Sequence, residues 1–190
     1  MTYTYRIEQD EDAENPRTAY DNASHMACWH RDYDLGDDLK KQDCPNEPGE
    51  FAAWAEQTKA VYLPLYLYDH SGITMSTSSF HDRWDSGQVG YIYLTRETIL
   101  KEWGWKVLTK ERRTFLENYM KGDVETYDQY LTGDVYGYIV EDENGETLDS
   151  CWGFYGSEHA EEEGKASMEY LWNDSPEGRQ KSLPFEGDKA

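Results

Sequence analysis

Two runs of apolar, aromatic and β-branched residues dominate the pattern of hydrophobic and polar positions along the chain. Residues 61–68 read VYLPLYLY and residues 89–94 read VGYIYL, and polar segments rich in Gly, Ser and Asp lie between them. Runs of this length and composition are typical of strands that are buried on at least one face. Pro64 has no amide proton to donate, so it predicts an edge position or a bulge within the first run.

Shorter stretches predict the remaining strands. Residues 2–7 alternate polar and large side chains, and residues 24–31 form a second short candidate. Residues 135–140 and 147–155 flank an Asn144-Gly145 pair. This pair tolerates the positive φ angles of a tight turn, so the segment predicts a β-hairpin.

Helical periodicity and helix-end signals predict about four helices, over residues 51–57, 95–104, 109–131 and 157–172. Thr95 is a suitable N-cap for the second helix, and Gly104 is a suitable stop. Residues 121–123, which include a glycine, predict a break in the third helix. Residues 8–22 lose all periodicity and predict a loop.

The order of these elements predicts the fold class. About five strands and about four helices, without an alternating βαβα rhythm, favour an α+β fold. We expect a single antiparallel or mixed sheet with the helices packed on one face. The length fits one domain, which we place at residues 1–172. Residues 173–190 are rich in Pro, Gly and charge, and we expect them to form a flexible polar tail.

Negative charge is concentrated at the two ends of the sequence. The formal net charge is −21; residues 51–140 carry 12 acids and 9 bases, and the remainder carries 27 acids and 9 bases. Such a field repels phosphate backbones, so direct nucleic-acid binding is disfavoured and a partner with a basic surface is favoured. We find neither a signal-peptide pattern nor an apolar run of 18 residues, so we expect no membrane segment. The three cysteines lack CxxC spacing, which favours a reduced, cytoplasmic protein.

Several blocks of this chain resemble a protein family that is often encoded by bacteriophages and mobile elements. The blocks are ENPR (14–17), YDN (20–22), MACWH (26–30), DLGD (34–37), YLYDHSGI (66–73), WDSGQVGYI (84–92) and WGFYG (152–156). Together they span roughly residues 7–157. The family has no assigned catalytic residues to carry over. The resemblance therefore implies a mobile-element context, and with it the cytoplasm of a host cell.

The segment between the two hydrophobic runs concentrates polar chemistry. His70, His81 and Asp85 are candidate catalytic residues, although a Ser-His-Asp triad would need partners from different elements. Ser86 lacks the Gly-x-Ser-x-Gly context of a nucleophile elbow, so the residues around it also predict a tight turn that leads into the next strand. Trp84 stands beside these corners and is either a binding residue or part of the core.

Other clusters are candidates for binding. Cys28 and His30 are weak candidates for a metal site, because no standard zinc spacing accompanies them, and we expect no cofactor. The candidate binding carboxylates are Asp32, Asp34, Asp37 and Asp38, which resemble a fragment of a calcium loop, and Glu141, Asp142 and Glu143 at the hairpin tip. A simpler interpretation is that these carboxylates are solvated loop residues.

Two functional hypotheses follow. In the first, the chain is an acidic accessory protein of a phage or mobile element that binds a basic host protein. Its carboxylates would imitate DNA phosphates and inhibit a nucleic-acid-handling defence protein, whereas a bland alternative is that the acidity only maintains solubility. In the second, the chain is a small enzyme or ligand-binding protein with a pocket that is formed by residues 69–87 and covered by the strand at Cys28–His30. We expect a non-enzymatic role.

Overall fold

The computed structural model describes residues 2–82, 84–176 and 178–179, and it has an α+β fold. The chain groups into two compact units: unit 1 comprises Met1–Ala13 and Gly133–Ala190, and unit 2 comprises Glu14–Thr132. Within the described residues, seven strands form two antiparallel sheets, so the expectation of one sheet of about five strands is wrong. The single domain predicted over residues 1–172 stays a prediction, and each unit is described by itself.

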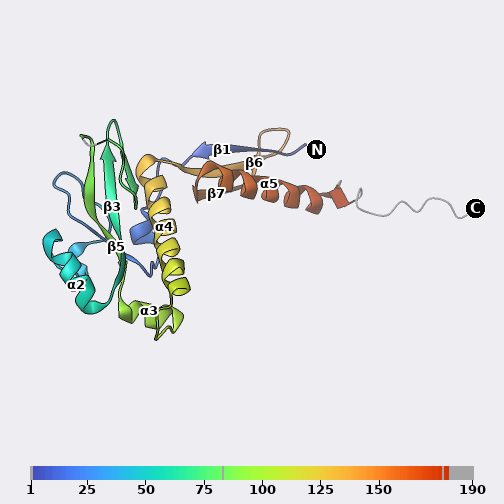
Figure 1. Cartoon of the computed structure of the whole chain (residues 1–190). Coiled ribbons are helices and arrows are strands. Elements are labelled where there is room, and N and C mark those ends of the chain that lie inside the picture. The colour runs from blue at the N-terminus through green and yellow to red at the C-terminus, as the bar shows by residue number, and fades with distance from the viewer. Residues whose placement is uncertain (1, 83, 177, 180–190) are drawn as a thin grey trace, which may run out of the picture. The chain divides into compact units, whose positions relative to one another are not determined.

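Unit 1 is a three-stranded sheet with one long helix. Its elements are β1 (Thr4–Gln9), β6 (Val135–Glu141), β7 (Thr147–Tyr155) and α5 (Ser157–Asp174). The sheet has the order β1-β6-β7, and α5 lies along it (Figure 1). The buried residues of α5 are Ala160 and Gly164. A Cβ atom on Gly164 would lie 2.8 Å from the Cβ of Tyr138, so a glycine is needed for the helix to approach the strand this closely.

The predicted hairpin is present as β6 and β7, but its turn differs from the expected one. The backbone carbonyl of Asp142 accepts a hydrogen bond from the Gly145 amide at 3.1 Å, so the turn spans residues 142–145. Only Gly145 of the Asn144-Gly145 pair has a positive φ angle, at 81°. The Asp142 carboxylate accepts hydrogen bonds from the amides of Asn144 and Glu146, each at 2.9 Å. The two strands are therefore joined by a turn with one left-handed glycine, and not by the two-residue turn that the Asn144-Gly145 pair predicted.

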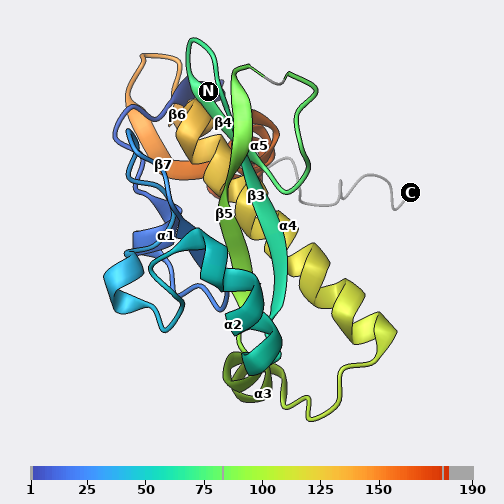
Figure 2. The same cartoon turned by 60° about the vertical axis from the view of Figure 1, so that its left-hand side comes forward.

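Unit 2 is a four-stranded sheet with helices on both faces. Its elements are α1 (Pro16–Ala19), β2 (His25–Cys28), α2 (Phe51–Thr58), β3 (Val61–Asp69), β4 (Ile73–Ser76), β5 (Ser86–Leu94), α3 (Arg96–Trp103) and α4 (Lys110–Thr132), with short 3-10 turns at Leu39–Lys41 and Pro48–Glu50. The strand order is β2-β5-β3-β4. Helices α2 and α4 lie on opposite sides of β3 and β5 (Figures 1 and 2). The expectation that all helices pack on one face is therefore wrong.

Two apolar layers explain this arrangement. On one face, Met120 and Val124 of α4 are buried with Leu65 and Ile92 of the sheet. On the other face, Phe51 of α2 joins a cluster of aromatic side chains from β3 and β5. Both faces of these strands are apolar because both are covered, and this is why the two runs read as continuous rather than alternating.

Helix α4 is continuous, so the break predicted at residues 121–123 is wrong. A glycine inside a helix costs about 1 kcal/mol relative to alanine. In α4 the buried residues Leu116, Met120, Val124 and Tyr127 flank Gly122 at helical spacing. Their burial outweighs the cost of the glycine, because each large apolar side chain contributes about 1.5–3 kcal/mol.

The central strands confirm the interpretation of Pro64. It lies in β3 before the residues that pair with β4, so one side of the strand is unpaired there. The register of β3 and β5 shifts immediately after Leu65, and Val89 is the extra residue in β5. Gly90 follows this bulge, and a Cβ atom on it would lie 2.1 Å from the carbonyl oxygen of Ala27 in β2. Close pairing of β2 with β5 therefore requires glycine at this position.

Several element boundaries differ from those expected. The short helix α1 lies inside the loop predicted at residues 8–22, and β4 was not predicted. Strand β5 begins at Ser86, so the tight turn expected at Asp85-Ser86-Gly87 is instead the start of the strand. Helix α5 extends to Asp174, and most of the tail expected at residues 173–190 lies outside the described residues. No helix in the described part of the chain is long and apolar enough to cross a membrane.

Candidate functional site

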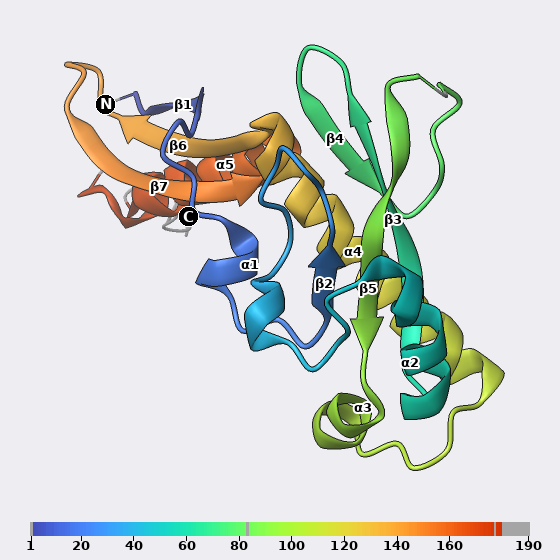
Figure 3. The same ribbon diagram turned by 90° about the vertical axis from the view of Figure 1, so that its left-hand side faces the viewer.

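Strands β3 and β5 meet at one end of the unit 2 sheet. The antiparallel register places the last residues of β3 beside the first residues of β5, whereas Cys28, the last residue of β2, lies opposite Gly90 within β5. The Asp69 amide donates to the Asp85 carbonyl at 2.8 Å, which closes this end. The β3–β4 hairpin and the loop before β5 project from the same end (Figure 3). A cavity of about 550 Å³ lies here, which is within the usual range for small-ligand sites.

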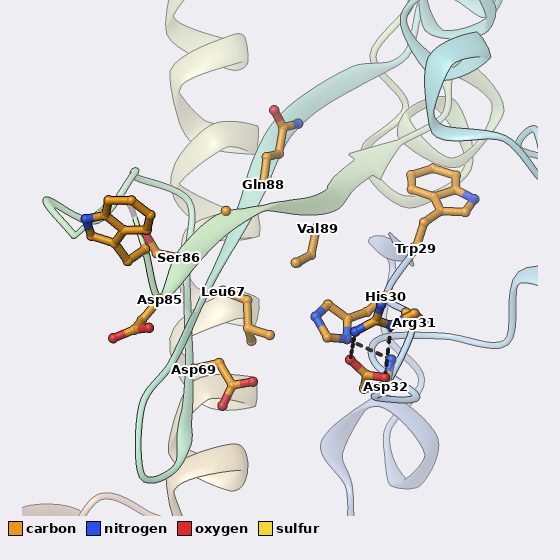
Figure 4. A pocket seen from close by; sticks show the side chains of 12 residues that line it. Trp29, His30, Arg31, Asp32, Leu67, Asp69, Asp85, Ser86, Gln88 and Val89 are labelled. Carbon is orange, nitrogen blue, oxygen red and sulfur yellow. Dashed lines mark hydrogen bonds and ion pairs between the residues drawn. The ribbon is translucent and has the colours of Figure 1, made fainter.

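The cavity has an apolar floor and polar walls. Leu67 and Val89 lie between two groups of polar side chains (Figure 4). Asp69 and Asp85 approach from the strand ends, and Asp32 approaches from the segment that follows β2. The floor can contact a methylene chain, and the walls carry negative charge.

Each wall carboxylate has a partner within unit 2. Asp32 receives two hydrogen bonds from the guanidinium of Arg31, at 3.2 and 3.1 Å. Asp69 Oδ2 accepts from the hydroxyl of Tyr33 at 3.0 Å. The hydrogen bond from Arg31 lowers the pKa of Asp32, and the hydrogen bond to Asp69 raises the pKa of Tyr33. Asp32 is therefore ionised and Tyr33 is protonated at neutral pH.

A histidine turn positions one wall of the cavity. The Nδ1 atom of His30 accepts hydrogen bonds from the amides of Asp32 and Tyr33, both at 3.2 Å. The rings of His30 and Tyr33 are stacked with centroids 5.0 Å apart. In this tautomer the proton of His30 is on Nε2. The turn fixes the direction from which Tyr33 reaches Asp69.

Two tryptophans line the cavity in different ways. The indole of Trp29 donates to the carbonyl of Asn46 at 2.7 Å and makes an edge contact with Phe51, so its position is fixed. Trp84 is 95% exposed and has no aromatic contact within the described residues. Its backbone is held by Asp82, whose carboxylate accepts from the Trp84 amide at 2.7 Å. A fixed backbone that presents an exposed indole is typical of a contact residue.

The candidate catalytic residues are only partly brought together. His70 Nδ1 lies 3.1 Å from Asp85 Oδ2, where its N–H can donate, and Asp85 lines the cavity. His81 is exposed and is not among the described residues that line the cavity. The hydroxyl of Ser86 donates to the carbonyl of Asp82 rather than to a base. The geometry gives a His–Asp pair without an activated serine.

The weak metal candidates do not form a site in the described part of the chain. Cys28 points into the core, and burial raises the pKa of its thiol to about 12, so the thiolate that binds metals is disfavoured. The Nδ1 atom of His30 is already occupied by two backbone amides. Among the described residues, no group of three or more His, Cys, Asp or Glu side chains is placed to hold a metal ion.

The candidate carboxylates at residues 32–38 have separate roles. Asp37 is largely buried and accepts two hydrogen bonds from Arg17, at 2.8 and 3.1 Å. Asp38 caps the turn that begins at Leu39, and Asp34 is exposed. Only Asp32 of this group lines the cavity.

The carboxylates at the hairpin tip are also partly engaged. The Glu141 carboxylate lies 3.4 Å from Nη2 of Arg6. Asp142 stabilises the turn, and the backbone amide of Glu146 lowers its pKa. Glu143 accepts from the Thr2 amide at 3.3 Å. These acids are surface groups with local partners.

A denser set of carboxylates lies on α5. Glu158, Glu162 and Glu169 are exposed and, at helical spacing, lie on the side opposite Ala160 and Gly164, which are buried. Across residues 157–174 the helix carries six acids and one base. These carboxylates were not among the binding residues predicted from the sequence.

The pocket predicted in residues 69–87 lacks part of the lining that the structure shows. Arg31, Leu67, Gln88 and Val89 also line the cavity, and Tyr33 binds Asp69. Residues 29–32, at the end of a predicted strand, combine the rings of Trp29 and His30 with the oppositely charged Arg31 and Asp32. This combination could have indicated the missing part of the lining.

Comparison of the chain with protein-family models, with curated proteins and with solved structures finds no match. The function is therefore inferred from the chemistry of these surfaces alone.

Proposed function

We propose that the protein is an acidic interaction protein that binds a basic, nucleic-acid-handling protein of its host, in the manner of a DNA mimic. The observation that carries this proposal is the concentration of charge in unit 1. Residues 1–13 and 133–190 carry 19 acids and 5 bases, a net charge of −14, whereas residues 14–132 carry 20 acids and 13 bases, a net charge of −7.

The density of charge along α5 supports the proposal. Its 18 residues span about 27 Å, at about 1.5 Å per residue. The net charge of −5 on the helix corresponds to about one charge per 5 Å, compared with one phosphate per 3.4 Å along a DNA strand. The negative charge density along this helix is therefore more than half of that along a DNA strand. A basic groove that binds a phosphate backbone would be attracted to it.

The proposal is tested with a set of charge variants. The triple variant Glu158→Gln, Glu162→Gln and Glu169→Gln removes three charges from α5. A matched control removes three exposed charges from unit 2, by substitution of Glu50, Glu56 and Glu97 with Gln. Proteins from the host lysate are captured on each variant at low and at physiological salt, with duplex DNA as the competitor.

We expect the wild type to retain a basic nucleic-acid-handling protein that duplex DNA displaces. The α5 variant should lose this protein, and the matched control should retain it, because the two variants have the same net charge. The proposal is overturned if no such protein is recovered at either salt concentration. It is also overturned if both variants lose the partner equally, because the acidity would then act only as a diffuse field.

A small-ligand or enzymatic role is the alternative. The observation that favours it is the contact between His70 and Asp85 at the cavity of unit 2. Since the hydroxyl of Ser86 is engaged with the carbonyl of Asp82, this geometry supports ligand binding rather than covalent catalysis. A shift of the His70 imidazole resonances when a ligand is added, absent in Asp85→Asn, would support this alternative.

A further inference from the structure

The unexplained feature of unit 2 is an exposed indole beside a cavity of net negative charge. The ionisable side chains that line the cavity are Asp32, Asp69, Asp85, Arg31 and His30. With histidine counted as neutral at pH 7, the three carboxylates and one guanidinium give a formal charge of −2. An anionic ligand is therefore disfavoured, and a cationic one is favoured.

One guanidinium, that of Arg31, already lines the cavity, and its pairing indicates the shape of the cation. Arg31 places Nε 3.2 Å from Asp32 Oδ1 and Nη2 3.1 Å from Asp32 Oδ2. This is the two-pronged geometry that a planar guanidinium makes with a carboxylate and that an ammonium group cannot reproduce. The side chain of Arg31 is 90% exposed, so its pairing leaves the interior of the cavity open.

The opposite wall offers a second carboxylate site and an aromatic surface. Asp69 and Asp85 both lie there, and each accepts a hydrogen bond from one neighbour, Tyr33 or His70. A carboxylate has about four lone-pair sites, so both retain acceptor capacity. The indole of Trp84 is available to stack on a flat cation, and guanidinium is the cation that stacks best on an aromatic face.

We propose that this cavity binds an arginine side chain of a partner polypeptide. The guanidinium is held by Asp85 and Asp69, its methylene groups lie on Leu67 and Val89, and Trp84 covers its face. A cavity of about 550 Å³ is larger than one guanidinium and can admit the peptide backbone on either side of it. This site does not depend on the carboxylates of α5, and it goes beyond the proposed function.

The test uses short fluorescein-labelled glycine–serine peptides, each with one central residue. That residue is arginine, lysine or citrulline, and citrulline keeps the shape of arginine without its charge. Binding is measured by fluorescence anisotropy at low salt to the wild type and to the variants Asp85→Asn and Trp84→Ala. Glu56→Gln is the control for lost charge, and Tyr170→Ala is the control for a lost exposed aromatic ring.

We expect the arginine peptide to bind about tenfold or more tightly than the lysine peptide, and the citrulline peptide not to bind. Asp85→Asn and Trp84→Ala should each weaken arginine binding about tenfold, and the two controls should change it less than twofold. Circular dichroism establishes that each variant is folded, and Trp84→Ala removes a side chain that is almost fully exposed.

Three outcomes overturn the proposal. Equal binding of the arginine and lysine peptides would show a general cation effect without recognition of the guanidinium. Equal weakening by Glu56→Gln and Asp85→Asn would attribute binding to the field of the whole protein. No binding of the arginine peptide at low salt would remove the site. Each of these results leaves the DNA-competition test of α5 unaffected, so the two proposals fail separately.

Discussion

Replacement of Arg17 by methionine is expected to destabilise unit 2 strongly. The side chain of Arg17 is 2% exposed. It donates two hydrogen bonds to Asp37 and one to the carbonyl of Ser24, at 2.7 Å. Its Nη1 atom lies 3.9 Å from a carboxylate oxygen of Asp123, beyond hydrogen-bond distance. The substitution would leave two largely buried carboxylates without their counter-charge.

The magnitude follows from this burial. Removal of one partner from a buried ion pair costs about 3–5 kcal/mol, because the remaining charge is uncompensated. A urea m-value of about 2 kcal/mol/M converts a loss of about 4 kcal/mol into a midpoint lower by about 2 M. The matched control is Arg113→Met, which removes the exposed pair with Glu117 at 3.1 Å. Such a surface pair contributes less than about 1 kcal/mol, so the control should shift the midpoint by less than about 0.5 M.

The assay is urea unfolding followed by tryptophan fluorescence at several pH values. Burial alone raises the pKa of Asp37, but hydrogen bonds from His25 and Arg17, with the charge of Arg17, outweigh it and lower the pKa. The stabilisation from Asp37 is therefore present above its unfolded pKa and is lost as the pH falls through the lower folded value. Without Arg17, burial is expected to raise the pKa of Asp37, as burial already raises the pKa of Asp123.

Acidification should therefore narrow the difference in the free energy of unfolding between the wild type and Arg17→Met. In Arg17→Met, protonation relieves the buried carboxylates as the pH falls from 7 toward the ordinary aspartate pKa of about 3.9. The wild type gains nothing from protonation of Asp37 over the same interval. A midpoint change as small as that of Arg113→Met, or a difference that widens on acidification, would refute the assignment of Arg17 as a buried counter-charge.

Two further predictions concern packing and thiol chemistry. Gly90→Ala should lower the free energy of unfolding by about 1–3 kcal/mol or more, because its Cβ would lie 2.1 Å from the Ala27 carbonyl oxygen. The control is Gly87→Ala, whose Cβ would meet nothing within 4 Å. In the same urea assay it should change the free energy of unfolding by less than about 1 kcal/mol. Equal effects of the two substitutions would contradict the close approach of β2 and β5. With Ellman's reagent at pH 8, one of the three thiols should react rapidly, because Cys151 is exposed whereas burial raises the pKa of Cys28 to about 12. Rapid reaction that persists in Cys151→Ser would show that the buried thiols are accessible.

Much of the local structure was predictable from sequence, because its causes are local. Thr95 caps α3 by accepting from the Thr98 amide, and Gly104 ends the helix with a φ angle of 67°, as their residue types predicted. The hairpin of β6 and β7 was predicted from its turn residues and flanking strands. Pro64 was placed correctly because a missing amide proton restricts a strand wherever it occurs.

Two of the errors involve interactions between distant residues. Gly122 predicted a break in α4, but four buried side chains hold the helix together across it. The pattern of strands did not reveal that β1 pairs with β6 rather than with β2, because hydrogen-bond partners in a sheet are chosen by the tertiary packing of apolar faces. This choice produced two sheets in place of one.

The sequence by itself determined the excess of negative charge, the α+β class and most helix ends, since composition, periodicity and capping act over a few residues. Only the tertiary structure decided which polar residues meet. His70 reaches Asp85 but His81 does not join them, and Tyr33 reaches Asp69 across 36 positions of sequence. Such contacts depend on strand register, in which a shift of one residue turns a side chain to the opposite face.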